Sequence, residues 1–169
     1  PNAGKKKLIN RLSREEAIKA LQSETFPRIT TSFYRYVDIS DPAILRNELY
    51  EEWSELGVFG RVYLAQEGVN AQISIPEHNM DAFISLLHSH DEFREMHQKI
   101  AIEDDGKSFF KLIIKTKDQI VADGLAYGEY DITNVGNHLD ARQWNDALDE
   151  GAIVVDMRNH YESEIGRFE

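Results

Sequence analysis

The stretch RVYLAQEGVNAQISI, residues 61–75, decides the fold of this chain. Its first half alternates apolar Val62 and Leu64 with outward-facing neighbours, which is the period-two pattern of a strand with one buried face. The last five residues return to a strand-like composition, and the Glu67-Gly68 pair between the two halves supplies the glycine that a tight turn needs. Strands joined by so short a turn pair antiparallel. The stretch therefore predicts a β-hairpin.

Signals on both sides of the hairpin add strands and helices. Residues 30–39 are rich in Thr, Phe, Tyr, Val and Ile, which suits a strand. Asp41-Pro42 is typical of a helix start, because Asp caps free amides and Pro fits the first turn. A last strand pair is expected at residues 99–103 and 108–116, joined by a turn at 104–106. Apolar residues recur at helical spacing after Pro42 and again after Pro76: Leu45, Leu49, Trp53 and Leu56, then Met80, Phe83, Ile84 and Leu87.

The resulting order over residues 30–121, β-α-β-β-α-β, is that of a ferredoxin-like sandwich, one sheet with two helices on a single face. The predicted fold class is therefore α/β, specifically an α+β ferredoxin-like sandwich. Residues 1–29 form an N-terminal extension with a short helix, which the S-x-x-E capping box at Ser13 opens. Residues 122–138 lack an apolar period and are interpreted as a linker. A further helix is expected at 140–148.

Residues 153–169 have the pattern of a second domain that begins and is not completed. Ile153-Val154-Val155 is an apolar β-branched run, typical of a strand buried on both faces. Asp156, Arg158 and Glu162 follow it, and a short helical stretch is expected to end at Gly166. This pattern resembles the first βα unit of a rhodanese domain. The resemblance implies that the three charged residues support the active-site loop. We expect residues 139–169 to be the start of such a domain, truncated before its catalytic loop.

Composition limits the functions open to these residues. The 169 residues carry a formal net charge of −11, which argues against loose electrostatic binding to nucleic acid and requires any RNA contact to use a local patch. The chain has no cysteine, so it holds no disulfide, thiolate metal site or cysteine nucleophile. Neither a metal-binding histidine pair nor an apolar stretch of bilayer length is present. We expect a soluble cytoplasmic protein that binds no metal, has no cofactor in this chain and does not contact a membrane.

Two groups of residues have side chains suited to RNA. On the predicted open face of the sheet, aromatic and basic residues interleave, and such surfaces stack unpaired bases. The alternative is that the tyrosines of this face pack against another domain or line the core. If Tyr34 and Tyr36 point outward, strand alternation turns Arg35 inward. At the hairpin turn, Glu67 and Asn70 beside Arg61 form a cluster that can grip a phosphate or a base edge. The alternative there is an ordinary turn, in which Gly68 adopts positive φ and Asn70 bonds its own backbone. The open-face residues are Tyr34, Tyr36, Tyr63, Lys111 and Lys115.

Several segments resemble, in order, the bacterial rhodanese-related tRNA uridine hydroxylases: residues 32–36, 58–74, 104–109, 121–124 and 156–162. The resemblance implies that the whole protein hydroxylates the wobble uridine of tRNA to 5-hydroxyuridine, with molecular oxygen as co-substrate and the anticodon stem-loop as the bound element. It also implies a catalytic cysteine in the rhodanese loop. Because that cysteine lies beyond Glu169, we expect residues 1–169 alone to be inactive.

Three other functions remain open. A rhodanese domain can transfer sulfur through a cysteine persulfide, which would make the protein a sulfurtransferase. The chain can also be a non-catalytic RNA-binding module. Acylphosphatase shares the ferredoxin-like order and uses an Arg and an Asn, but its Arg lies in a glycine-rich loop after the first strand. The corresponding residues here, Val37-Asp38-Ile39-Ser40-Asp41, contain neither Arg nor Gly, so this function has little support.

Overall fold

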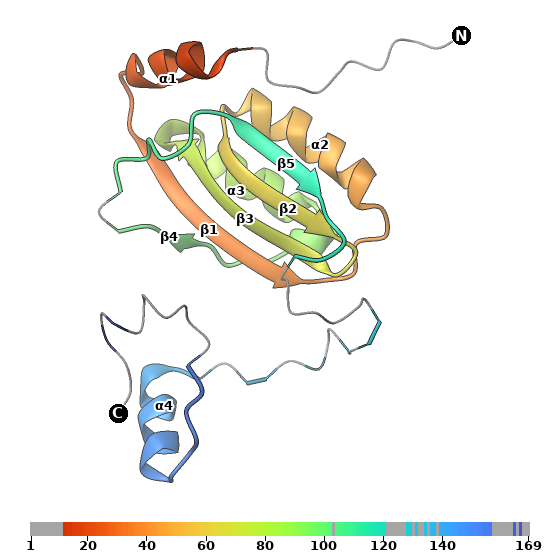
Figure 1. Ribbon diagram of the computed structural model, residues 1–169, viewed down its shortest axis with the longest axis vertical. Coiled ribbons are helices and arrows are strands. Elements are labelled where there is room, and N and C mark those ends of the chain that lie inside the picture. Colours follow the sequence, from red (N-terminus) through yellow and green to blue (C-terminus); the bar gives the residue numbers. More distant parts are fainter. Residues whose placement is uncertain are drawn as a thin grey trace. The chain divides into compact units, whose positions relative to one another are not determined.

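The computed structural model describes residues 12–102, 104–120, 128, 129, 131, 134, 136, 137, 139–156, 164 and 166. The chain divides into two compact units, Pro1–Thr133 and Asn134–Glu169. The first unit contains a twisted sheet with helices, and the described part of the second contains helix α4 (Figure 1).

The first unit is built on a five-stranded sheet in the order β4-β1-β3-β2-β5. The strands β1, β3, β2 and β4 pair antiparallel, and β5 adds to the edge of β2 in parallel. The order of the first four strands is that of the predicted ferredoxin-like sandwich, and β5 extends it by one strand. The strands are β1 (Arg28–Tyr36), β2 (Phe59–Ala65), β3 (Gly68–Pro76), β4 (Lys99–Ile100) and β5 (Leu112–Thr116).

The strand pair predicted at 99–103 and 108–116 is wrong. β4 and β5 lie at opposite edges of the sheet, β4 beside β1 and β5 beside β2. The segment between them crosses the end of the sheet instead of turning back. Thr30 Oγ1 donates to Asp104 at 2.6 Å, and Ser74 Oγ donates to the Gly106 carbonyl at 2.6 Å. The turn at Asp104-Asp105-Gly106 forms as a local feature, but bonds to β1 and β3 hold it there.

Helices α2 (Pro42–Glu55) and α3 (Met80–Ser89) cover one face of the sheet. α2 begins where predicted, because the Asp41 carboxylate accepts from the amides of Ala43 and Ile44. Trp53 lies at the centre of the core, with its ring 6.3 Å from that of Phe33 and 5.2 Å from that of Phe83. Short 3-10 helices flank α3 at Glu77–Asn79 and Asp91–Phe93. Both predicted helical stripes point to the sheet.

The predicted N-terminal helix is α1 (Arg14–Gln22), and its capping box forms as expected. The Ser13 amide donates to Glu16 Oε2 at 2.9 Å and the Glu16 amide donates to Ser13 Oγ at 3.2 Å. The hydrogen bonds from Ser13 also lower the pKa of the Glu16 carboxyl below its usual range. α1 buries only Ala17 and Leu21, so its interactions with the sheet are limited.

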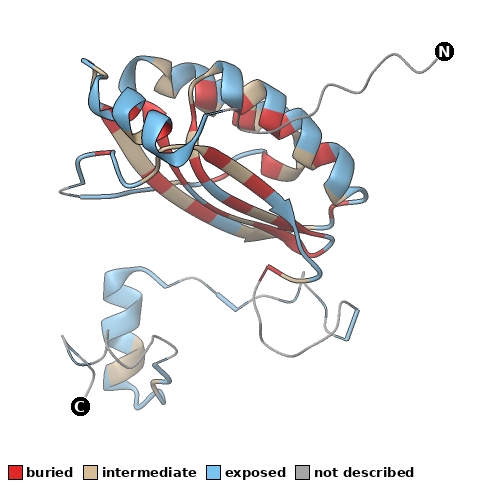
Figure 2. Cartoon of the chain, turned by 45° about the horizontal axis from the view of Figure 1, so that its top comes forward, coloured by how far each residue is buried: buried red, intermediate tan, exposed pale blue. Residues whose placement is uncertain are grey.

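The second unit contains α4 (Ala141–Asp149), which starts at a capping box between Asp140 and Gln143. α4 buries none of its residues, whereas the strands and α2 are rich in buried residues (Figure 2). The strand predicted at 153–155 does not form within the described residues, where Ile153 is 91% exposed. A strand of this kind needs neighbouring strands, and the described part of this unit has none. The predicted residues Arg158 and Glu162 lie outside the described residues, and the rhodanese-like assignment of 139–169 stays a prediction.

Candidate nucleic-acid interface

The strand register gives the sheet two chemically different faces. On β3, Val69, Ala71, Ile73 and Ile75 face the helices and are buried. Their alternating neighbours face the other way, since successive side chains of a strand point to opposite sides. We call this second side the open face. No described helix packs on it as α2 and α3 pack on the first side, and Figure 1 views the sheet from it.

Two cross-strand rows of side chains run across the middle of the open face. In the first, which we call the tyrosine row, Tyr34 is opposite Asn70, Asn70 is opposite Tyr63, and Tyr63 is opposite Lys115. The second, the arginine row, runs parallel to it one repeat along the strands. It consists of Lys99, Ser32, Gln72, Arg61 and Ile113. The two rows contain three cations and no carboxylate.

One end of the open face is covered by Arg28 and the loop at 104–108. The Arg28 guanidinium lies 4.2 Å from the centre of the Phe59 ring, and its Nε donates to Ser74 Oγ at 2.9 Å. Nη1 donates to Glu24 at 3.1 Å, and Nη2 donates to the carbonyls of Gly57 and Ser74. Burial lowers the pKa of Arg28 from its ordinary value, and Glu24 opposes that shift. These contacts keep this end of the sheet closed.

The loop itself is fixed by Asp104. The Asp104 carboxylate accepts from the Thr30 hydroxyl, from the Gly106 amide at 2.7 Å and from the Ser108 hydroxyl at 3.4 Å. The bond from Thr30 does most to hold the pKa of Asp104 below its usual range, followed by that from Gly106. Gly106 has φ of 71° and no room for a side chain, since an added Cβ would lie 2.5 Å from the Arg28 carbonyl oxygen. The loop therefore requires glycine where it crosses the sheet.

The segment after β5 closes the other end. Ala65 faces the open side and is fully buried, and the Ile120 amide donates to Glu67 Oε1 at 2.6 Å. Glu67 is only 1% exposed. The predicted cluster of Glu67, Asn70 and Arg61 is therefore wrong for Glu67. Its carboxylate is buried and accepts a hydrogen bond from the Ile120 amide, so it is not available to a ligand. Asn70 and Arg61 do share the open face, in adjacent rows, and Gly68 adopts the predicted positive φ, 148°.

Between these covered ends, the predicted tyrosines lie on the open face. Tyr34 is 59% exposed, and its ring meets that of Tyr36 edge-on at 6.1 Å. Lys117 Nζ lies 5.8 Å from the centre of the Tyr63 ring, within range of a cation–π contact. Lys111 precedes β5, and its carbonyl accepts from the Gly60 amide at 2.9 Å. The β2 pairing thus continues to Lys111, which alternation places on the same side as Lys115.

Arg35 faces the helix side, as the outward tyrosines require, yet it is not an isolated buried charge. Its guanidinium donates to the carbonyls of Glu92, Arg94 and Glu95, at 3.4, 2.8 and 3.3 Å. These carbonyls belong to the end of the 3-10 helix after α3 and the residues beyond it. Arg35 therefore has hydrogen-bond partners at the rim of the core, which removes the objection to placing Tyr34 and Tyr36 outward.

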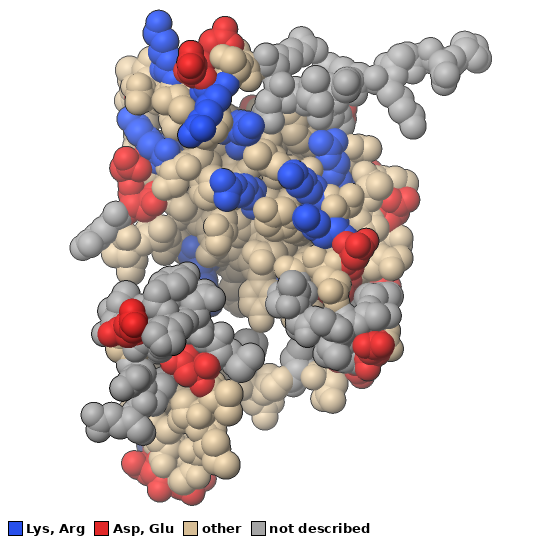
Figure 3. Space-filling model, in the orientation of Figure 1, with Lys and Arg blue, Asp and Glu red and all other residues tan. Residues whose placement is uncertain are grey.

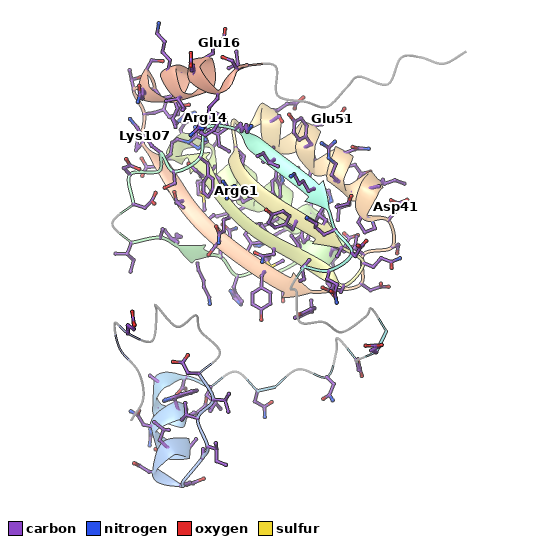
Figure 4. The ribbon with its side chains drawn as sticks, viewed as in Figure 1. Arg14, Glu16, Asp41, Glu51, Arg61 and Lys107 are labelled. Carbon is purple, nitrogen blue, oxygen red and sulfur yellow. The ribbon has the colours of Figure 1, made fainter. Side chains whose placement is uncertain are left out.

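Charge is unevenly distributed over the first unit. Basic side chains gather over β2 and β5 on the side that Figure 3 shows, where the register places Arg61 and Lys115. In Figure 4, Arg61 lies over the sheet, whereas Asp41 and Glu51 project from α2. Exposed carboxylates on α2 also include Glu48 and Glu55. A chain with a net charge of −11 thus presents a basic sheet face and an acidic helix face.

Sequence reasoning missed two residues of the open face, Lys99 and Gln72. Lys99 was assigned to a hairpin that does not exist, so its place beside Ser32 was not visible. Gln72 lies in the predicted hairpin, and strict alternation from Asn70 would have found it. Among the described residues, no group of three His, Cys, Asp or Glu side chains is placed to hold a metal ion, and none of the described helices has the length and apolar character needed to cross a membrane.

Comparison with known proteins agrees with this architecture. A tRNA uridine(34) hydroxylase of Leptospira interrogans is 54% identical over 166 residues, which are 98% of this chain and 45% of that protein. Proteins of the same name from Photorhabdus laumondii and Escherichia fergusonii are each 48% identical over 164 residues, 96% of this chain and 47% of theirs. The chain therefore spans about half the length of these relatives. Residues 28–120, which include the whole sheet, match the UPF0176 acylphosphatase like domain, and the chain belongs to the UPF0176 family.

Proposed function

We propose that this chain is the RNA-positioning part of a tRNA uridine hydroxylase that modifies the wobble uridine. The relatives named tRNA uridine(34) hydroxylase support the reaction. The RNA-positioning role is supported by the open face. There the tyrosine row and the arginine row place exposed aromatic rings and cations together on an otherwise acidic protein. On this proposal the anticodon stem-loop of tRNA lies across these two rows, and the protein works in the cytoplasm.

The physical basis is stacking combined with local attraction. An aromatic ring that stacks on an unpaired base contributes about 1–3 kcal/mol to binding, whatever the base. Cations in the two rows attract the phosphates, and the acidic helix face repels them. Together these effects select one orientation of the polyanion. An RNA loop fits this surface better than a duplex, because its bases are free to stack.

On this proposal the chemistry belongs to a rhodanese-like loop outside residues 1–169, with a cysteine as its catalytic group and molecular oxygen as co-substrate. This chain contains no cysteine. The acylphosphatase-like description fits the fold, but the loop after β1 has no arginine to bind an acyl phosphate. No contact between residues that the structure describes favours phosphatase chemistry.

The proposal is tested by titrating an anticodon stem-loop against the full-length protein and against Tyr34→Ala and Tyr36→Ala. Each substitution should weaken binding by about 1–3 kcal/mol if the ring stacks on a base. Ile44→Ala is a matched control, because Ile44 is 56% exposed on α2, on the helix side. Folding is checked by circular dichroism. Unchanged affinity in both folded tyrosine variants would assign these rings to packing and overturn the proposed interface.

A further inference from the structure

Asn70 occupies a position on the open face that the fold does not explain. It lies in β3 between Tyr34 on one neighbouring strand and Tyr63 on the other. Asn is depleted in strands, where β-branched and aromatic residues are favoured. The Asn70 side chain is half-buried, and its carboxamide makes no hydrogen bond to any described residue. A polar group with one acceptor and two donors thus lies on the open face without a hydrogen-bond partner among the described residues.

The turn does not account for Asn70 either. The hairpin loop consists of Gln66 and Glu67, since Ala65 pairs with Gly68. Gly68 supplies the unusual backbone conformation, and an added Cβ there would lie 2.1 Å from the Arg35 carbonyl oxygen. Asn70 comes two residues later, inside the paired strand, and forms no hydrogen bond to its own backbone. The reasons that usually favour Asn near a turn are therefore absent.

We propose that Asn70 reads the edge of one unpaired base that stacks on Tyr34; this inference rests on the proposed function. Adjacent strands are about 4.7–4.9 Å apart, so a base lying over Tyr34 has its edge within reach of the Asn70 carboxamide. An amide can pair with a base edge in a bidentate manner, donating through its nitrogen and accepting through its oxygen. Lys115, at the far end of the same row, is placed to attract a phosphate of the same strand. Tyr34 holds the base, Asn70 distinguishes it, and Lys115 contributes affinity without sequence preference.

The ligand is a single-stranded RNA segment. In a duplex the pairing edge of each base is occupied by its partner, and the deep major groove of A-form RNA excludes side chains. A carboxamide can pair with more than one base, so the choice among bases is set by which of its two atoms faces the ligand. That choice is measurable as a ratio of affinities.

The test compares binding of ten-nucleotide oligo(U), oligo(C) and oligo(A) by the 169-residue chain and its variants at one salt concentration. We expect the parent chain to prefer one of the three. Asn70→Ala should weaken binding of the preferred oligonucleotide by roughly 5- to 150-fold, the value of one bidentate contact, and bring the three affinities close together. Asn70→Asp keeps the shape and the acceptor but removes both donors, so it should weaken binding of the preferred oligonucleotide and change the ratio of the three affinities.

Asn47→Ala is the matched control, since Asn47 is an exposed amide on α2, on the helix side of the sheet and outside both rows. It should leave the ratio of the three affinities unchanged. A parent chain that binds all three equally, or folded Asn70 variants that keep the parent's ratio, would overturn the role of Asn70 while leaving the open face as an RNA interface. Failure of the parent and of the full-length protein to bind any RNA would instead overturn the proposed function.

Discussion

Removing the Ser74 hydroxyl should open the covered end of the sheet. Ser74 is fully buried in β3. Its Oγ accepts from Arg28 Nε at 2.9 Å and donates to the Gly106 carbonyl at 2.6 Å. The hydroxyl therefore links β1, β3 and the crossing loop through two hydrogen bonds. Ser74→Ala removes both and leaves a buried guanidinium N–H and a buried carbonyl without that partner.

The expected loss of stability follows from these two contacts. A hydrogen bond to a charged group contributes roughly 1.5–3 kcal/mol, and leaving a buried carbonyl unsatisfied costs about 1–3 kcal/mol. Arg28 keeps its bonds to Glu24 and to two carbonyls, so the loss should lie toward the lower end of the summed range, about 2.5–4 kcal/mol in the free energy of unfolding. With an m-value of about 2 kcal/mol/M in urea, the midpoint should fall by about 1–2 M.

The measurement is a urea unfolding curve monitored by far-ultraviolet circular dichroism. Tryptophan fluorescence is less suitable, because Trp53 lies in the first unit and Trp144 in the second. Ser32→Ala is the control, since Ser32 is on the same face and its hydroxyl bonds no described residue; it should change stability by less than about 0.5 kcal/mol. Equal effects of the two substitutions would show that the crossing loop is not held by Ser74, and the boundary drawn for the open face would be wrong.

Three further predictions concern charge and chemistry. The folded-state pKa of Asp104 is lowered, chiefly by the hydrogen bond from Thr30. The ionised Asp104 carboxylate therefore stabilises the fold at pH values above the unfolded pKa of about 3.9. This stabilisation is lost as pH falls through the lowered folded-state pKa. The stability gap between the parent and Asp104→Asn should be largest near pH 7 and shrink below about pH 4; a gap that does not change with pH would contradict this. Lys115→Ala should reduce the salt dependence of stem-loop binding by about one phosphate contact, and a slope equal to the parent's would remove Lys115 from the interface. Residues 1–169 alone should form no 5-hydroxyuridine, because they lack a cysteine; product from a preparation free of full-length protein would move the chemistry into this chain.

The sequence alone predicted those elements whose signals are local. The capping box at Ser13, the Asp41-Pro42 start and the helix after Asp140 all formed, because a cap depends on residues only a few positions apart. The period-two alternation of residues 61–64 predicted which side of β2 is buried, since the pleat fixes the direction of each side chain. The ferredoxin-like order followed from these elements.

Tertiary structure decided which strands became neighbours and which polar groups became buried. The segment at 99–116 contains a turn and two strand-like runs, yet the runs pair with β1 and β2 because their hydrogen bonds are satisfied at distant edges of the sheet. Glu67 looks like an exposed turn residue in the sequence, and only the return of the chain to Ile120 buries it. The run at 153–155 has the composition of a buried strand, but Ile153 is exposed where the described residues offer no partner strand. Side-chain direction is a property of the local backbone, whereas burial and strand pairing depend on segments far away in sequence, and for that reason only the folded chain shows them.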